Sequence, residues 1–521
     1  MVRHIDPGER AGRVSVIAAR LANASNDENV SFGRGVRPDT GPRPTPRATQ
    51  SLGRRFGYLW STFAVSSLGD GFGYGAVPLL ALFVNPHPLP VASVAAADTF
   101  PWLVLALPAG ALADRFERGR LMAVTNMSRA LVLVALALLV ATGRIDLALL
   151  IALVFINGGA RAIYYSASQA TVPELVEPSS FAHANGLLSG TEAATEHLGG
   201  PILGTLAFSV ARAFPFVADA SAVGAAGLSL LGFRTQHPDR SSAHGSILDG
   251  ARQLVRDRSL RLLVTLLAAL AGLQGFVMGV LVIIATVDWG VPKELYGLFL
   301  AAGAVGNVPG ALLADSFASR MGNVRTLIAS ALVSGIAYLV MGSAKGWLLA
   351  GICFAVVSFA VYAGSVVANS LRQRLSPRDL MGRIGAAWRG VVWGAFPIGS
   401  LIGGGLAVLG GLRLPLYIAG AAQCVVALVI ARPLTRSLAA SERAAQPADQ
   451  AVVGAGTAPT AFGTETSSNG GKPLTTTSDG DRPTTAGLAD EAVQAPAKRR
   501  LHSRTGHGPL YWGRSSRNWR R

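Results

Sequence analysis

The stretch "LPAGALADRFERGR", Leu107–Arg120, joins an apolar run to an abrupt charged turn. A second stretch, "NVPGALLADSFASRMG" at Asn307–Gly322, has the same pattern. Each copy stands between apolar runs, so the chain contains one charged hinge twice, and the fold has to explain this duplication. The residues that recur are Pro108 as Pro309, Leu112 as Leu313, Ala113 as Ala314, Asp114 as Asp315 and Phe116 as Phe317.

The composition indicates a lipid environment. Hydrophobic residues make up 50% of the 521 residues and charged residues only 14%, whereas soluble proteins carry about 25% charged residues. The formal net charge is +17, and 42 of the 46 basic residues are arginine. Because these arginines lie between apolar runs, they indicate membrane topology and not a nucleic-acid partner.

The cysteines and the N-terminus exclude other classes. Cys353 and Cys424 both lie in apolar runs, so we expect no structural disulfide, no metal site and no cofactor. The first 55 residues are polar and rich in arginine, and they contain no early apolar core, so no cleavable signal peptide is predicted.

Twelve apolar runs are long enough to cross a bilayer, which takes about 20 residues in a helix. Helices are predicted because a helix satisfies its own backbone hydrogen bonds in lipid. The fold class is therefore all-α integral membrane, with twelve transmembrane helices. The runs span about 57–84, 91–113, 121–142, 146–168, 181–210, 215–233, 260–289, 294–315, 324–344, 347–370, 384–410 and 414–434.

The repeated hinge divides these helices into two pseudo-symmetric six-helix halves. Asp114 follows the second run and Asp315 the eighth, and "LVEPSSFAHANG" (175–186) is echoed by "RLSPRDLMGRIG" (374–385). Duplicated halves with a substrate site between them are a transporter plan. The predicted segments are a disordered basic segment 1–55, an N-terminal half 56–234, a cytoplasmic connector 235–259, a C-terminal half 260–435 and a disordered cytoplasmic tail 436–521.

The stretch "GALADRFERGR" resembles the loop motif of the major facilitator superfamily between its second and third helices. Within the superfamily the chain is most similar to the enterobactin-exporter and macrolide-efflux branch, over about residues 55–435. The resemblance implies a monomeric secondary transporter of small molecules. The stretches that carry the branch resemblance are "SSLGDGFGYGAVPLL" (66–80), "SQATVPELVEPSSFAHANGL" (168–187), "PFVADASAV" (215–223) and "GRIGAAWRGVVWGAFPIGSLIGGGLA" (382–407).

The fifth run contains a partial match to the Gly-rich pattern of superfamily antiporters. The stretch is "GTEAATEHLGGPILGT" (190–205), in which Thr205 replaces the last glycine of the pattern. The resemblance implies export, while tight helix packing explains the same glycines without a direction. The matching residues are Gly190, Gly199, Gly200, Pro201 and Gly204.

The hinge suggests a gate. If the halves pack as in the resembled superfamily, Asp114 lies near the positive end of helix eleven and Arg383, and it would latch the halves together there. Asp315 would face the start of helix five in the same way. The alternative is a charged loop that only sets topology. The predicted gating residues are Gly110, Asp114, Arg115, Arg118, Arg120, Asp315 and Arg383.

The second latch is expected to be weaker than the first. Arg115 is replaced by Ser316, and Arg118 by Ser319, so the second copy keeps the acid and loses these two cations.

Ionisable residues at membrane depth are functional candidates by default. Glu192 and Glu196 lie one helical turn apart, and two adjacent carboxylates in a low dielectric should not both ionise, so one is expected to hold a proton. Asp219 and His197 are interpreted as structural. The proton-coupling candidates are Glu192, Glu196, Asp70 and Asp98, although Asp70 could instead be a packing residue, and the cavity charges are Arg161 and Arg389.

Several functions remain open. No ATP-binding motif is present, since in "NGGKP" (469–473) a proline follows the lysine, so a gradient is the energy source. The hypotheses are a proton-coupled exporter of amphiphilic small molecules (a drug, siderophore or secondary metabolite), an importer of a polar nutrient, a membrane enzyme and a sensor. Because no metalloprotease or nucleophile-elbow motif occurs, we expect no enzyme. The expected partners are the substrate, protons and the bilayer.

The loop charges predict that both termini are cytoplasmic, in a multi-pass plasma-membrane protein. With that orientation, fifteen arginines lie in inside loops and five basic residues in outside loops. Fusing alkaline phosphatase, which is active only in the periplasm, after residue 440 should therefore give no activity. A green fluorescent protein fusion at the same residue should fluoresce. The opposite pair of results would reverse the topology.

Overall fold

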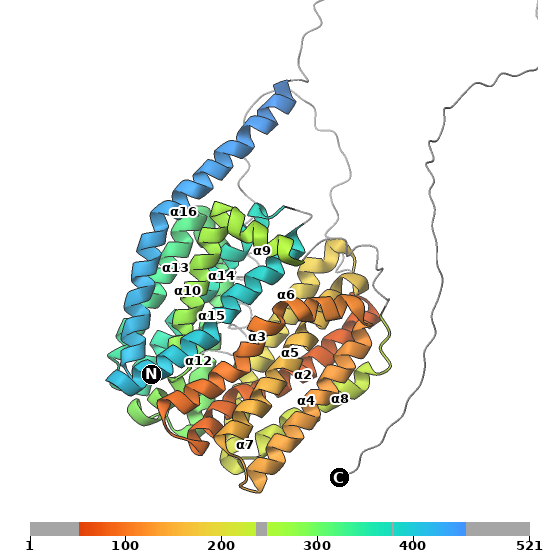
Figure 1. Cartoon of the computed structure of the whole chain (residues 1–521), viewed down its shortest axis with the longest axis vertical. Coiled ribbons are helices and arrows are strands. Elements are labelled where there is room, and N and C mark those ends of the chain that lie inside the picture. Colours follow the sequence, from red (N-terminus) through yellow and green to blue (C-terminus); the bar gives the residue numbers. More distant parts are fainter. Residues whose placement is uncertain (1–51, 236–246, 378–379, 455–521) are drawn as a thin grey trace, which may run out of the picture. The chain divides into compact units, whose positions relative to one another are not determined.

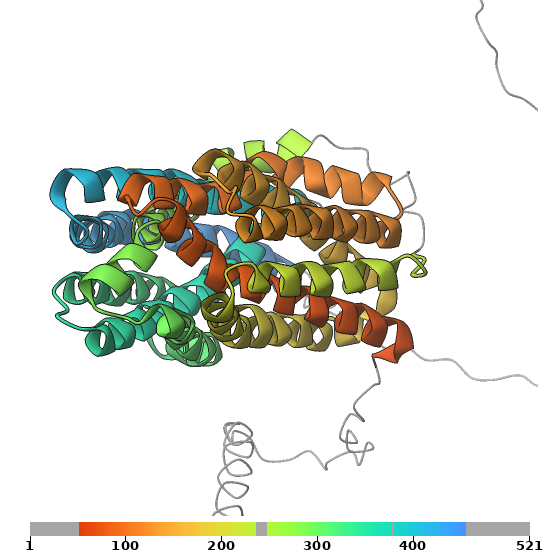
Figure 2. The ribbon, with the colours of Figure 1, turned by 90° about the horizontal axis from the view of Figure 1, so that it is seen from below.

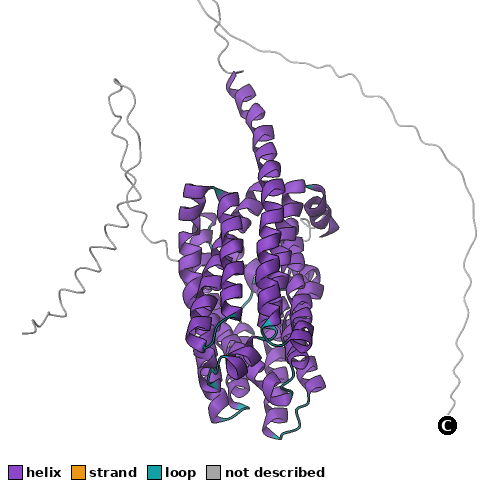
Figure 3. Ribbon diagram, turned by 90° about the vertical axis from the view of Figure 1, so that its left-hand side faces the viewer, coloured by secondary structure: helices purple, strands orange, loops and turns teal. Residues whose placement is uncertain are grey.

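The computed structural model describes residues 52–235, 247–377 and 380–454. All regular secondary structure in these residues is helical (Figure 3). Of the segments predicted to be disordered, 1–55 and 436–521, residues 1–51 and 455–521 lie outside the described residues, as does 236–246 of the predicted connector.

The first group of helices covers the predicted N-terminal half. In the fifth predicted run, two α-helices flank a π-helix, in which hydrogen bonds span one residue more than in an α-helix. The helices are α2 (Gly53–Val84), α3 (Pro88–Arg115), α4 (Arg118–Ala141), α5 (Leu147–Leu175), α6 (Phe181–Glu192), the π-helix η2 (Ala193–Gly199), α7 (Gly200–Val210) and α8 (Phe214–Leu230).

The second group follows the connector (Figure 1). Its helices are α9 (Ile247–Arg256), α10 (Arg258–Met278), α11 (Leu281–Ile283), the π-helix η4 (Ile284–Asp288), α12 (Tyr296–Met321), α13 (Asn323–Gly342), α14 (Trp347–Leu375), α15 (Met381–Gly410) and α16 (Leu414–Gly454). In Figure 2 most helices of the first group, coloured red to yellow, lie on one side, and the green to blue helices lie on the other.

Ten of the described helices are long and apolar enough to cross a membrane. They correspond to ten of the twelve predicted runs. The other two runs are also helical: 181–210 is divided by the π-helix η2, and α8 is an apolar helix of 17 residues. The all-helical class predicted from the apolar runs is thus confirmed for the described residues.

The last helix extends past residue 436, where the tail is predicted to begin. Helix α16 continues to Gly454, well past the apolar run that ends near 434. The chain just after that run, "RSLAASERAAQ" (436–446), is dominated by alanine, leucine, arginine and glutamate. These residues have high helix propensity, so a helix that starts in an apolar segment can extend through them.

Glycines let α2 and α7 meet backbone to backbone. A methyl group at Gly71 would lie 2.6 Å from the carbonyl oxygen of Thr195, and one at Gly75 would lie 2.6 Å from that of Pro201. Side chains at Gly200 and Gly204 would likewise overlap the α2 backbone. Small residues at such crossings are typical of membrane helices, where close van der Waals contact replaces the hydrophobic effect.

Two further contacts join the two helix groups. Helices α3 and α15 lie side by side (Figure 1), and the hydroxyl of Ser400 donates a hydrogen bond of 2.9 Å to the carbonyl of Ala92. Helix α7 packs against α12, where Gly297 lies against Pro201. Thr205 adds a hydrogen bond of 3.3 Å to the carbonyl of Glu294. The groups therefore contact each other through small residues and backbone.

Replacing Gly200 by valine should destabilise the protein by about 1–3 kcal/mol, because the new side chain overlaps the backbone of Gly71. Gly190→Val is the matched control, since no atom lies within 4 Å of a methyl group at Gly190. Thermal unfolding of the two purified variants in detergent measures the stability of each. Equal losses of stability in the two variants would show that close packing at Gly200 is not the cause.

Candidate functional site

Four charged side chains from four helical elements form one buried network. Arg129 of α4 forms an ion pair with Asp70 of α2, and Arg161 of α5 forms one with Glu196 of η2. The guanidinium Nε of Arg161 also lies 3.5 Å from Oδ1 of Asp70. Asp70 therefore links the two arginines, and the network ties four separate elements together.

Arg129 is the most deeply buried member, with 0% of its side chain exposed. Its remaining donors face three neutral acceptors: Oδ1 of Asn157 at 3.3 Å, Oγ of Ser66 at 3.4 Å and Oδ1 of Asn126 at 3.3 Å. A buried cation needs both a counter-charge and such hydrogen bonds to offset its lost hydration. Arg161 is different, because 23% of its side chain is exposed.

The exposed part of Arg161 lines a pocket that it shares with three carboxylates. Asp70, Glu192 and Glu196, three of the four predicted proton-coupling candidates, all line this pocket, and their role in coupling stays a prediction. Glu196 is held by Arg161, whereas half-buried Glu192 forms no ion pair with any described residue. The other lining residues are Phe63, Ser67, Tyr164 and Tyr165.

The fourth candidate acid, Asp98, is half-buried on α3. It lies within electrostatic range of Arg161, Asp70 and Glu196 but does not line the pocket. It forms no ion pair within the described part of the chain. The structure thus separates Asp98 from the three acids that face one another.

Pro201 explains the π-helix that carries Glu196. Proline has no backbone N–H, and its ring clashes with the carbonyl four residues earlier, here His197. The π-helix η2 ends at Gly199, directly before this site, so the extra residue in the turn accommodates the ring. π-Helical turns of this kind are frequent at functional sites.

The predicted antiporter-like glycines have unequal surroundings. Gly200 and Gly204 are packed against α2, and Gly199 faces the carbonyl of Ala194 at 3.2 Å, measured from a built Cβ. Gly190 has open space instead. The close-packed part of the motif is therefore its C-terminal part.

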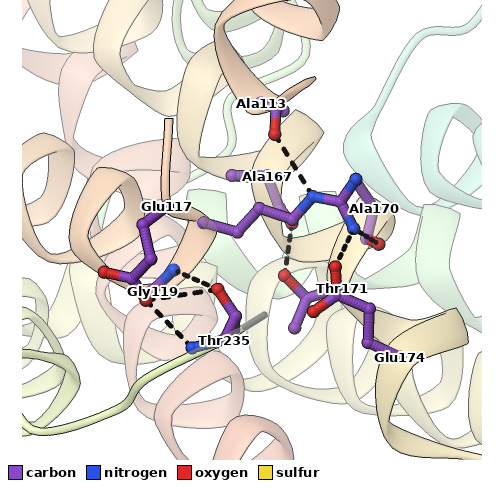
Figure 4. Close-up of polar contacts among 9 residues, drawn as sticks. Ala113, Glu117, Gly119, Ala167, Ala170, Thr171, Glu174 and Thr235 are labelled. Atoms are coloured by element: carbon purple, nitrogen blue, oxygen red, sulfur yellow. Dashed lines mark hydrogen bonds and ion pairs between the residues drawn. The ribbon is translucent and has the colours of Figure 1, made fainter. Parts of the chain in front are cut away.

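The first hinge is braced within its own group of helices (Figure 4). Arg118 donates hydrogen bonds to the carbonyls of Ala170 at 2.7 Å and Ala113 at 3.2 Å, and it forms an ion pair with Glu174. These contacts connect the end of α3, the start of α4 and the end of α5.

Glu117 completes this brace on the other side. Its carboxylate accepts a hydrogen bond of 2.9 Å from the backbone N–H of Thr235 (Figure 4). It also accepts one of 3.3 Å from the backbone N–H of Arg120. Sequence reasoning missed Glu117, Glu174 and Thr235 as partners of the hinge. The available signal was Glu174 itself, an acid in a predicted cytoplasmic loop without arginine, whereas the other predicted cytoplasmic loops carry arginines.

The latch residues remain a prediction. Asp114 lies in the last turn of α3, and its side chain is outside the described part of the structure. Asp315 is exposed and forms no ion pair with a described residue. Arg383 lies 3.9 Å from the carboxylate of Asp249 on α9, so the start of α15 contacts the connector helix. Gly110 has open space around it, and Arg115 and Arg120 are exposed.

Two charged candidate residues, Asp219 and Arg389, lie outside the network. Asp219 of α8 is buried against the glycines of α2, with its Oδ1 lying 2.6 Å from a methyl group built at Gly69. Arg389 of α15 is exposed and does not belong to the network around Arg161. Sequence reasoning had grouped Arg161 and Arg389 as cavity charges, and the structure places them on different helix groups.

A bundle of membrane-length helices with a buried charge network at mid-helix defines a polytopic membrane transporter. The profile of the transmembrane secretion effector family, MFS_3, matches residues 52–455. The chain belongs to this family of the major facilitator superfamily.

Relatives and solved structures agree with this assignment. The multidrug efflux pump Tap of Mycolicibacterium fortuitum is 26% identical over 359 residues, which cover 66% of this chain and 87% of the pump. The fold is similar to that of a bacterial homologue of the iron transporter ferroportin in its inward-facing state (TM-score 0.59, 18% identity, 74% of this chain and 100% of that one). It is also similar to the nucleoside transporter NupG (TM-score 0.59, 13% identity, 73% and 99%).

Asp70→Asn should destabilise the protein by about 3–5 kcal/mol, because it leaves fully buried Arg129 without its counter-charge. The double variant Asp70→Asn/Arg129→Gln removes both charges and should recover part of that loss. Denaturant unfolding of both variants and of Arg129→Gln completes a double-mutant cycle. Additive effects in this cycle would argue against a direct Asp70–Arg129 interaction.

Proposed function

We propose that this chain is a proton-coupled exporter that moves amphiphilic small molecules, such as a drug, siderophore or secondary metabolite, by alternating access. The observation that carries the proposal is the pocket in which three carboxylates face a single shared guanidinium. Ionisable groups at membrane depth are costly and mark proton or substrate pathways. The relative named as a multidrug efflux pump favours export of such molecules.

The proposal includes a topology of twelve transmembrane helices in two pseudo-symmetric six-helix halves, 56–234 and 260 onward. The packing of equivalent helices supports it. Helix α3 packs on α5 as α12 packs on α14, and α4 packs on α5 as α13 packs on α14. The crossing of α2 with α7 likewise has a counterpart in that of α10 with α15. The protein would act as a monomer in the plasma membrane, with both termini cytoplasmic.

Glu192 is the proposed proton carrier. Arg161 compensates the charge of Glu196, and Arg129 that of Asp70, so Glu192 is the acid in the pocket without a cation of its own. The pocket has room for about one water molecule, which could deliver a proton. This assignment narrows the predicted pair, Glu192 and Glu196, to one titrating member.

The proposed cycle uses this acid as a switch. Protonation of Glu192 from outside neutralises the pocket and releases the substrate, and deprotonation to the inside restores the negative charge. A potential of about 100 mV supplies about 2.3 kcal/mol for each proton that moves inward. That energy corresponds to a substrate gradient of about fiftyfold. Asp114 and Arg383 would close the cytoplasmic side between these steps.

Glu192→Gln should abolish uphill transport, because glutamine keeps the shape of the side chain and cannot carry the proton. Inverted membrane vesicles that are energised by respiration and supplied with a fluorescent amphiphile such as ethidium in the outer medium measure this, since an exporter carries the dye into them. Glu177→Gln is the control, since Glu177 is an exposed acid in the loop after α5. The control should accumulate dye like the natural protein, and Glu192→Gln should only equilibrate it.

Two results would contradict the proposal. If Glu192→Gln and the double variant with Glu196→Gln still accumulate dye with an unchanged pH dependence, coupling does not use these acids and must be sought at Asp70 or Asp98. If substrate accumulates only in vesicles of the opposite orientation, the protein is an importer.

A further inference from the structure

A second charged site lies in the other helix group, where α14 and α15 meet. A methyl group built at Gly385 of α15 would lie 2.9 Å from Nη1 of Arg372 and 3.8 Å from Nη1 of Arg389. The two guanidinium groups therefore approach one point, and the glycine leaves that point free of side-chain atoms.

The two arginines have no acidic partner. Neither forms an ion pair with any residue in the described part of the chain, and the Nε of Arg372 is buried without a hydrogen-bond acceptor there. Arg372 lies over the buried ring of Trp388, whose centroid is 5.8 Å from Cζ. Two adjacent cations repel each other, and an unsatisfied buried donor is costly, so an anion bound between them would relieve both penalties.

This arrangement contrasts with the network around Arg161. There, each of the arginines Arg129 and Arg161 has a carboxylate within the protein. Arg372 and Arg389 instead keep guanidinium donors available. Guanidinium groups match carboxylate and phosphate oxygens with paired hydrogen bonds, so the free chemistry at Gly385 is that of an oxyanion site.

One member of the arginine pair, Arg389, lies near a residue of the pocket described above. Tyr165 lines that pocket and lies within electrostatic range of both Glu192 and Arg389. Its ring meets that of Trp102 edge to face, with 5.6 Å between centroids. From the other group, Tyr362 of α14 lies within electrostatic range of Glu192 and Glu196. Aromatic side chains thus lie close to the acidic pocket, and Tyr165 is also near Arg389, so they offer a surface on which an apolar molecule could pack.

We propose that Arg372 and Arg389 bind an oxyanion group of the transported amphiphile, so that acidic and zwitterionic molecules are preferred over purely cationic ones. This inference rests on the proposed function and names its substrate class. The acidic group sits between the guanidinium groups at Gly385, and the apolar body extends toward Tyr165. A lipid phosphate offers the same chemistry, so the experiment separates the two sources.

Equilibrium binding to the full chain in lipid-free maltoside detergent tests the site. The probes are three pyrene amphiphiles of similar size: 1-pyrenebutyrate, 1-pyrenebutanol and a pyrenebutyl trimethylammonium ion. Pyrenebutyrate should bind most tightly. Arg372→Gln and Arg389→Gln should each weaken its binding about tenfold, as expected for the loss of one charged hydrogen bond. Both variants should change pyrenebutanol binding less than twofold.

Control variants separate a loss of anion binding from a loss of folding. Arg374→Gln removes an exposed arginine of the same helix and should leave all three affinities unchanged. Gly385→Ala fills the gap between the guanidinium groups and should weaken the binding of pyrenebutyrate only. An unchanged unfolding temperature would show that this variant still folds normally. Equal binding of the three probes, or equal losses in Arg374→Gln and Arg389→Gln, would overturn the site.

Three further outcomes distinguish lipid from substrate and this inference from the proposed function. If micelles containing phosphatidylglycerol abolish pyrenebutyrate binding while phosphatidylcholine does not, the pair is a headgroup site and the inference fails. If the anion preference is absent but Glu192-dependent efflux of ethidium persists, the inference alone fails. Arginine-dependent anion binding without any uphill transport would support the site and contradict the proposed function.

Discussion

The position of Arg129 constrains the first helix group more than any other single residue. A fully buried guanidinium requires a carboxylate and several neutral acceptors, and these come from α2, α4 and α5 at one level of the bundle. Asp70 supplies the counter-charge and also reaches Arg161, which in turn holds Glu196. The register of four helical elements is therefore fixed by charge as well as by apolar packing. The residue left over, Glu192, is the one for which we propose a transport role.

Backbone contact between α2 and α7 serves the same arrangement. Gly71 and Gly75 allow the helix that carries Asp70 to approach the fifth helical segment closely. Pro201, which lies at this contact, also ends the π-helix that presents Glu196 to Arg161. The partial antiporter-like motif thus has a structural explanation that holds for either direction of transport: the proline shapes the turn, and the glycines set the distance.

Much of the fold could be predicted because apolar length is a local property of the sequence. Each predicted apolar run lies in a helical segment, with ends that differ by a few residues in most cases. The end of the last helix was missed because α16 continues through residues of high helix propensity that are not apolar. The candidate acids could also be identified one by one, since a charge in an apolar run is conspicuous.

The pairing within the site could not be predicted. Which acid Arg161 binds depends on how α5 packs on α2 and η2, and no spacing within one helix contains that information. The hinge illustrates the same limit. Its motif was recognised, but Glu174 and Thr235, which hold it, lie far along the chain and come near only after folding.

The two copies of the hinge differ in the contacts that hold them. In the first, Arg118 and Glu117 fasten the start of α4 to α5 and to the chain after α8, so these elements can be displaced only together. In the second, Ser319 bonds only to the carbonyl of Ser316 one turn earlier, and α13 follows Gly322, whose φ of 87° turns the chain. The first copy of the hinge is therefore anchored to segments far away in the sequence, whereas the hydrogen bond of Ser319 in the second stays within a single helical turn.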